Sequence, residues 1–328
     1  MTFSPTAALG VLATVAAIDC APVHPAVPAS PEHIATASMD AGRVRSAPPA
    51  VLGAASRSVA GARLVTFPSR DADLVRGDAT VIDGWLFQPE GPGPFAAVVA
   101  LHGCAGLYGG RGDLTARHRD WAERLVREGY VVLMPDSFSA RGLDEICSRD
   151  QRTVRPSYER NRDVYGALEY LEGLPFVRTD RVALLGWSNG GMTVLAAVAA
   201  RTRARPTTLP HLPVVAVAFY PGCRSTVERA DWLPPAVALH ILIGELDDWT
   251  PASECVELAA QAERVGAPID VVVYPGAYHD FDDPVMKVHV RDRVATTPSG
   301  TATIGQDPAA RADSVERVTR ILRQALRP

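Results

Sequence analysis

Residues 182–191 hold the pattern that decides the fold, and they read Val-Ala-Leu-Leu-Gly-Trp-Ser-Asn-Gly-Gly. The four apolar residues predict a buried strand, and the Ala- and Val-rich stretch 190–201 predicts a helix directly after it. Ser188 stands between them, with glycines two positions before and two positions after it. A serine that projects its hydroxyl from such a turn needs small neighbours, because the backbone there is strained. The context therefore favours a nucleophilic serine over a glycine-rich turn with an incidental serine.

Short β-rich runs before and after this motif indicate the fold class. They cover 64–67, 80–87, 96–101, 130–134, 182–185, 214–219, 237–243 and 270–274. From the third run onward the apolar residues are continuous, as in strands buried on both faces of a parallel sheet. Helix-length segments alternate with them at 116–128, 157–172, 190–201, 252–265 and 308–326. The pattern predicts an open α/β sheet in one folded domain, residues 61–328.

The ends of the predicted helices carry their own signals. Asp307 is placed as an N-cap, with Pro308 at the first position of the last helix. Gly129 and Gly266 follow two other helical segments, where helix-ending glycines belong.

A nucleophilic serine needs an imidazole to take its proton and a carboxylate to fix the imidazole tautomer. On this kind of sheet the partners follow in the order serine, acid, histidine, each after a later strand. His279 lies just past the run 270–274 and is the expected base, whereas His240 lies within a strand run and is expected in the core. Asp247 and Asp248 compete as the acid, with Glu245 third; Asp247 lies nearer the end of the run 237–243 than Asp248 and has the G-x-x-D-x-x-x-P spacing, so it is preferred.

Two backbone N–H groups are expected to bind the negative charge that develops on a carbonyl oxygen. One belongs to Asn189, the residue after the serine, and the other to Cys104, in the loop after the run 96–101. The alternative for that second loop is a tight turn alone. Tyr108, Trp187 and Trp249 are placed as substrate-lining candidates, with aromatic packing against the sheet as the alternative for the two tryptophans.

Composition excludes several classes of protein. The chain has 328 residues and a formal charge of −4, so nucleic acid is not an expected partner. Lys287 is the only lysine, and no phosphate-binding loop of the Gly-Lys-Ser/Thr type can form. The sequence contains neither Cys-x-x-Cys nor His-Glu-x-x-His, so we expect no metal site. The acids Asp280, Asp282 and Asp283 are interpreted as a solvated acidic turn and not as a calcium site.

The cysteines and the N-terminus bear on the compartment. Two disulfides, Cys223–Cys255 and Cys104–Cys147, are one expectation, and four unpaired buried thiols are the other. Residues 1–60 are rich in Ala, Pro and Ser and are interpreted as a leader and flexible approach segment, with a signal peptide over 1–20. The apolar stretch 7–18 favours export, whereas the first six residues lack the usual Lys or Arg, which favours the cytoplasm. We expect export and no membrane span.

Ser188, Asp247 and His279, preceded by HGCAGL at 102–107, resemble the α/β-hydrolase superfamily. More narrowly, five segments resemble the dienelactone hydrolase family: PDSFSARG (135–142), GWSNGG (186–191), FYPGC (219–223), GELDDWTP (244–251) and PGAYHDFD (275–282). The resemblance runs from about residue 75 to the C-terminus. It implies an eight-stranded, mostly parallel sheet with helices on both faces, and hydrolysis of an ester or lactone through an acyl-enzyme. The substrate would then be a small molecule, and no cofactor is implied.

One departure from the family pattern qualifies this expectation. The family's namesake enzymes use a cysteine nucleophile, and this chain has Ser188 there, which favours a serine esterase over an enzyme for dienelactone itself. Arg141, Arg149 and Arg152 are interpreted as solvated surface and not as ligands of a substrate carboxylate. A serine peptidase on the same fold and a catalytically inactive binding protein are the alternatives.

Overall fold

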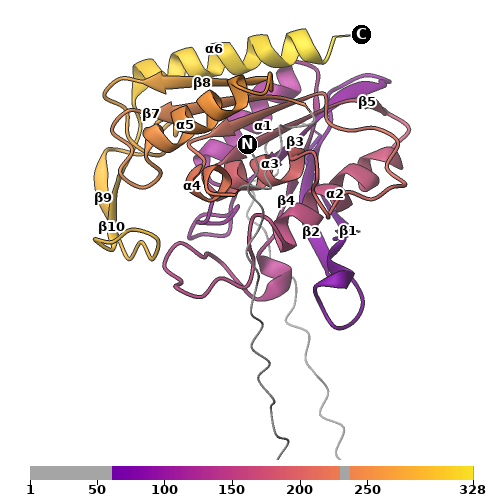
Figure 1. The fold of residues 1–328 in the computed structure, drawn as a ribbon. Helices are drawn as coiled ribbons and strands as arrows, with labels where there is room; N and C mark the ends of the chain where they lie inside the picture. The colour runs from indigo at the N-terminus through magenta and orange to yellow at the C-terminus, as the bar shows by residue number, and fades with distance from the viewer. Residues whose placement is uncertain (1–60, 230–236, 328) are drawn as a thin grey trace, which may run out of the picture. The chain divides into compact units, whose positions relative to one another are not determined.

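The computed structural model describes residues 61–229 and 237–327, and they build a central eight-stranded sheet (Figure 1). Its strands run in the order β1-β2-β4-β3-β5-β6-β7-β8. Their bounds are β1 (Arg63–Pro68), β2 (Val81–Phe87), β3 (Phe95–Leu101), β4 (Val131–Pro135), β5 (Val177–Trp187), β6 (Val215–Phe219), β7 (Ala238–Gly244) and β8 (Ile269–Tyr274). The pairs β1–β2 and β2–β4 are antiparallel and the others are parallel, which confirms the predicted fold class.

Burial explains why these segments form strands. Every residue of β4 and β6 is buried, and β3 is buried after its first residue, as the continuous apolar runs predict. The edge strands β1 and β8 are more exposed. His240 lies on β7 beside the β8 edge with a side chain 25% exposed, 3.5 Å from Asp270, so its expected place in the core is wrong.

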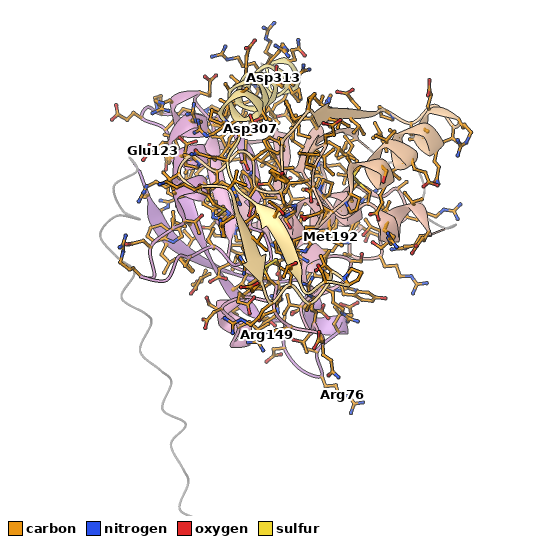
Figure 2. The ribbon with its side chains drawn as sticks, turned by 90° about the vertical axis from the view of Figure 1, so that its left-hand side faces the viewer. Arg76, Glu123, Arg149, Met192, Asp307 and Asp313 are labelled. Carbon is orange, nitrogen blue, oxygen red and sulfur yellow. A yellow bond between two sulfur atoms is a disulfide. The ribbon has the colours of Figure 1, made fainter. Side chains whose placement is uncertain are left out.

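The helices are α1 (Ala116–Arg127), α2 (Glu159–Glu172), α3 (Asn189–Val198), α4 (Arg224–Val227), α5 (Ala252–Glu263) and α6 (Pro308–Ala325), with short 3-10 turns at Asp71–Asp73 and Ser139–Arg141. They cover both faces of the sheet (Figure 1). Asp307 caps α6 by accepting from the N–H groups of Ala309 and Ala310 (Figure 2 labels Asp307 at the start of the helix). Gly129 and Gly266 take φ of +86° and +70°, as helix-ending glycines do.

A two-stranded antiparallel sheet of β9 (His289–Asp292) and β10 (Thr301–Ile304) was not predicted from the sequence (Figure 2, facing the viewer). Both strands are four residues long, and β9 is mostly exposed, so neither carries a continuous apolar run. The hairpin lies against the loop that follows β8. Ile304 forms a bridge with His279, and the N–H of Gly305 donates to the His279 carbonyl at 2.9 Å.

Both expected disulfides are present, Cys104–Cys147 and Cys223–Cys255. The leader expected over residues 1–60, with its signal peptide, lies outside the described residues. Within the described ranges, no helix is both long enough and apolar enough to cross a membrane.

Candidate active site

Ser188 occupies a strained turn between β5 and α3. Its φ of +51° and ψ of −114° are rare for a residue with a side chain. The turn is tight enough to require glycine on either side. A Cβ on Gly186 would lie 2.4 Å from the carbonyl oxygen of Gly190, and a Cβ on Gly190 would lie 2.0 Å from that of Leu101. The Gly-x-Ser-x-Gly pattern thus has a direct steric cause.

His279 forms a buried pair with Asp247. The imidazole Nδ1–H donates to Oδ2 of Asp247 at 2.7 Å, and both side chains are at most 1% exposed. The second carboxylate oxygen accepts from the N–H groups of Trp249 at 3.0 Å and Thr250 at 2.8 Å. Burial alone would lower the pKa of His279, but the Asp247 carboxylate outweighs it and raises that pKa above its ordinary value. The carboxylate therefore holds both the tautomer and the orientation of the ring.

Asp248 and Glu245, the two alternatives for the acid, form hydrogen bonds with other residues. Asp248 accepts from the N–H of Thr303 at 2.8 Å and from its hydroxyl at 3.0 Å, so it anchors the β9–β10 hairpin. Glu245 accepts from the N–H of Gly276 at 3.0 Å.

The remaining imidazole nitrogen, Nε2 of His279, is buried and has no hydrogen-bond partner among the described residues. The structure therefore does not join it to Ser188 by a hydrogen bond. The two residues are connected indirectly, through the residues that end β6. The N–H of Ser188 donates to the carbonyl of Phe219 at 2.9 Å, and the ring of the next residue, Tyr220, lies 4.5 Å from the His279 ring. Catalytic hydrogen bonds are often long in an unliganded site and tighten when substrate binds.

The loop after β3 lies against Ser188. A Cβ on Gly103 would lie 3.6 Å from Cβ of Ser188, in ordinary contact. This places the amide of Cys104 one residue away from that contact. Asn189 is the first residue of α3, so its N–H has no intrahelical acceptor. Both expected amides therefore belong to backbone beside the serine.

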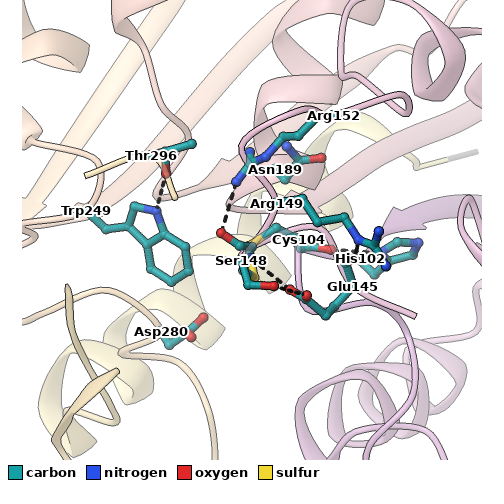
Figure 3. The surroundings of a disulfide bond; sticks show 12 residues. His102, Cys104, Glu145, Ser148, Arg149, Arg152, Asn189, Trp249, Asp280 and Thr296 are labelled. Atoms are coloured by element: carbon teal, nitrogen blue, oxygen red, sulfur yellow. Dashed lines mark hydrogen bonds between the residues drawn. A yellow bond between two sulfur atoms is a disulfide. The ribbon is translucent and has the colours of Figure 1, made fainter. Parts of the chain in front are cut away.

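The Cys104–Cys147 disulfide ties this loop to the segment 143–148 (Figure 3). The N–H of Ile146 donates to the Cys104 carbonyl at 2.8 Å, and the N–H of Ala295 donates to the Cys147 carbonyl at 3.0 Å. Trp249, whose Nε1–H donates to Thr296 at 2.9 Å (Figure 3), packs against the apolar cluster that contains both cysteines. Because the Trp249 ring also lies 4.8 Å from the His279 ring, the disulfide cluster is one residue away from the imidazole.

The substrate-lining candidates are placed differently from one another. Trp187 is fully buried, 6.0 Å from the Trp121 ring, so it packs within the core as the alternative had it. Trp249 is half-buried, and its ring lies 4.8 Å from the His279 ring. Tyr108 is half-buried, and burial raises the pKa of its hydroxyl above the ordinary value.

The expected solvated acidic turn at 280–283 is wrong, because Arg117 of α1 lies among the acids. Its guanidinium is 2.7 Å from Asp280, 3.2 Å from Asp282 and 3.5 Å from Asp283, and the last two residues are buried. Asp282 also accepts from the indole of Trp187 at 2.8 Å. The acids thus brace the loop that carries His279. No group of acids, histidines or cysteines within the described ranges could hold a metal ion.

Arg141 is also placed differently from the expectation of a solvated side chain. Its side chain is 12% exposed and forms ion pairs with Asp71 at 2.9 Å and with Asp163 at 2.7 Å, so its role is structural. Arg152 is half-buried and donates to the Cys147 carbonyl at 3.5 Å, which also departs from a solvated surface. Arg149 is exposed, as expected.

Arg160, on the first turn of α2, went unnoticed in the sequence. It is 1% exposed, and it donates to the side-chain oxygen of Asn189 at 2.6 Å and to the carbonyl of His102 at 2.7 Å. No local pattern marks it, because its partners lie 29 and 58 positions away.

A cavity of about 600 Å³ lies along α3 and does not include Ser188, Asp247 or His279. Its lining reaches Met192, one helical turn beyond the serine, and includes Asn161 and Arg201.

The sheet topology and the serine turn define an α/β-hydrolase. The chain belongs to the dienelactone hydrolase family, whose model matches residues 82–326. The expectation of a hydrolase of ester or lactone bonds is therefore confirmed at the level of the family.

Individual relatives are distant. A Bradyrhizobium protein named "Probable 2-oxo-3-(5-oxofuran-2-ylidene)propanoate lactonase" is 26% identical over 223 residues, which cover 63% of this chain and 80% of that one. A dienelactone hydrolase-like promiscuous phosphotriesterase from metagenomic libraries superposes with a TM-score of 0.57 at 19% identity, covering 81% of this chain and 99% of that one. The propionate-bound esterase Est2 of Thermogutta terrifontis superposes with a TM-score of 0.55 at 18% identity, covering 82% of this chain and 96% of that one. At these identities the two structures support the fold alone.

Proposed function

We propose that the chain cleaves a carboxylic ester or lactone through an acyl-enzyme on Ser188, with His279 as the base and Asp247 as its orienting acid. The backbone N–H groups of Cys104 and Asn189 bind the oxyanion. One observation carries the proposal: the buried His279–Asp247 pair, at 2.7 Å, leaves Nε2 of the imidazole without a hydrogen-bond partner among the described residues, in a fold that holds Ser188 on a strained turn. An imidazole so held has one nitrogen free to accept a proton.

In the first half of the reaction, Ser188 Oγ forms a bond to the substrate carbonyl carbon while its proton moves to Nε2 of His279. The carbonyl oxygen becomes an oxyanion and accepts from the two amides. The intermediate then collapses, the bond to the alcohol oxygen breaks, and that oxygen takes the proton from His279. In a lactone the alcohol stays attached to the acyl group.

In the second half, water replaces the alcohol. His279 takes a proton from water, whose oxygen bonds to the acyl carbon, and the oxyanion forms again at the same amides. Collapse breaks the bond to Ser188 Oγ, which recovers its proton from His279. Asp247 stays ionised throughout and stabilises the imidazolium that forms in each half.

The rate should fall on the acid side of neutrality, because a protonated His279 cannot accept the serine proton. Since the Asp247 carboxylate raises the pKa of His279 above 6.5, the acid limb of kcat/KM is expected above pH 6.5. At pH values below the pKa of His279, kcat/KM should fall about tenfold per pH unit. The check is a kcat/KM profile for p-nitrophenyl acetate in buffers of constant ionic strength. A profile that stays flat down to pH 5 would contradict His279 as the base.

Two assays separate the proposed function from its alternatives. A fluorophosphonate should label Ser188, with a Ser188–phosphorus bond replacing the phosphorus–fluorine bond, and peptide mass mapping should locate the adduct. A folded protein that takes no label would favour the inactive binding protein. A panel of p-nitrophenyl esters, lactones and peptide anilides should then show turnover of esters or lactones. Turnover of the anilides alone would favour the peptidase.

A further inference from the structure

Arg160 connects the two backbone segments that carry the proposed oxyanion amides. Its Nη1 donates to the Asn189 side chain at 2.6 Å and its Nη2 donates to the His102 carbonyl at 2.7 Å. The first partner belongs to the residue that supplies one amide. The second lies two residues before Cys104, which supplies the other. A single planar group therefore links the two backbone segments of the proposed oxyanion hole.

The charge on this guanidinium has no carboxylate partner, which is unusual for a buried cation. Within the described ranges Arg160 forms no ion pair, and its Nε is buried without a hydrogen-bond partner. Burial lowers the pKa of Arg160 to about 9, which still leaves it charged at neutral pH. Arg162, two residues along the same helix, has an ion pair with Asp73 and provides the contrast.

The groups that surround the Arg160 head are neutral or more distant. The ring of Phe138 lies 5.3 Å from its guanidinium carbon. His102, whose carbonyl it binds, is fully buried, and burial together with Arg160 holds the pKa of that imidazole well below its ordinary value, so the ring is neutral. Asp163 and Asp136 favour the charged form of Arg160, but neither forms an ion pair with it, and Asp163 is already paired to Arg141 at 2.7 Å.

We propose that Arg160 is a positioning residue of the oxyanion hole. It fixes the loop after β3 and the start of α3 at the spacing that lets both amides reach one oxygen, and it presents a positive charge that the oxyanion balances. This inference rests on the proposed function. Arg160 acts through the backbone and does not touch the substrate. Because it supports charge that exists only in the transition state, it should affect kcat more than KM.

The test compares Arg160→Met, Arg160→Lys and the matched control Arg162→Met. With p-nitrophenyl acetate, Arg160→Met is expected to lose about 10- to 100-fold in kcat, with KM changing by less than about threefold. Arg160→Lys keeps the charge but reaches fewer acceptors, so it should recover part of the loss. Arg162→Met removes an ion pair with Asp73 and should lower the melting temperature while kcat stays near wild type.

A second measurement separates positioning from general damage to the fold. A trifluoromethyl ketone forms a hemiketal oxyanion on the serine, whereas the uncharged secondary alcohol obtained by reducing that ketone does not. Arg160→Met and Arg160→Lys should weaken binding of the ketone more than binding of the alcohol. If Arg160→Met does not fold, Arg160→Lys alone provides the comparison. The inference is overturned if the Arg160 variants keep wild-type kcat and ketone affinity, or if Arg162→Met loses as much kcat. A Ser188→Ala protein with wild-type turnover would instead overturn the proposed function, and this inference with it.

Discussion

Ser188→Ala is expected to lower kcat for p-nitrophenyl acetate by on the order of 10⁵- to 10⁶-fold. The substitution removes the oxygen that forms the acyl bond, and water held in the same site is a far weaker nucleophile. Stability should change little, because alanine has the same backbone restriction at φ +51° as serine. The measurement is steady-state turnover beside a thermal melt of each protein.

Ser314→Ala is the matched control for that experiment. Ser314 is buried as well, but it lies on α6 and its hydroxyl donates to the Arg311 carbonyl at 2.9 Å. The Ser314→Ala substitution should lower the free energy of unfolding by about 1 kcal/mol and leave kcat unchanged. Equal rates for wild type and Ser188→Ala would remove Ser188 from the mechanism.

Asp247→Asn is expected to lower kcat by about 10³- to 10⁴-fold. The amide is nearly the same shape, but it cannot stabilise the imidazolium. It can also donate to Nδ1, which would leave the proton on Nε2, where it blocks transfer from Ser188. Loss of the carboxylate charge should also move the acid limb of the pH profile to lower pH, because that charge raises the pKa of His279. Both changes are measured in one kcat/KM profile.

Asp248→Asn provides the neighbouring control. Its carboxylate binds Thr303 of β10, so the substitution should loosen the hairpin and leave the activity within about threefold of wild type. A larger loss of kcat in Asp248→Asn than in Asp247→Asn would reverse the assignment of the acid.

The parts of the fold that were predictable are those that local sequence determines. The eight strands of the main sheet follow from short apolar runs, and β3, β4 and β6 are buried almost throughout. The serine turn is equally local, since the glycines at 186 and 190 stand where a side chain would collide with backbone. Candidate residues for the acid and the base follow from strand ends, because loops after parallel strands meet at one edge of the sheet.

The parts that were missed depend on contacts between distant segments. Three acids near His279 look like a solvated turn until Arg117 is brought to them from α1, more than 160 positions earlier. Arg160 has no distinctive neighbours in the sequence, and only the packing of α2 against the loop after β3 and the start of α3 gives it partners. The β9–β10 hairpin is short and largely polar, so its pairing is determined by the loop it contacts.

The covalent link between Cys104 and Cys147 makes thiol chemistry relevant to how the enzyme is produced. Oxidised cysteines persist where glutathione does not reduce them, and a protein folded in a reducing cytosol would lack this cross-link. The loop carrying the Cys104 amide would then be held only by its hydrogen bonds and by apolar packing. Purification without dithiothreitol, from a host that oxidises its secreted proteins, is the preparation in which the site matches the geometry described above.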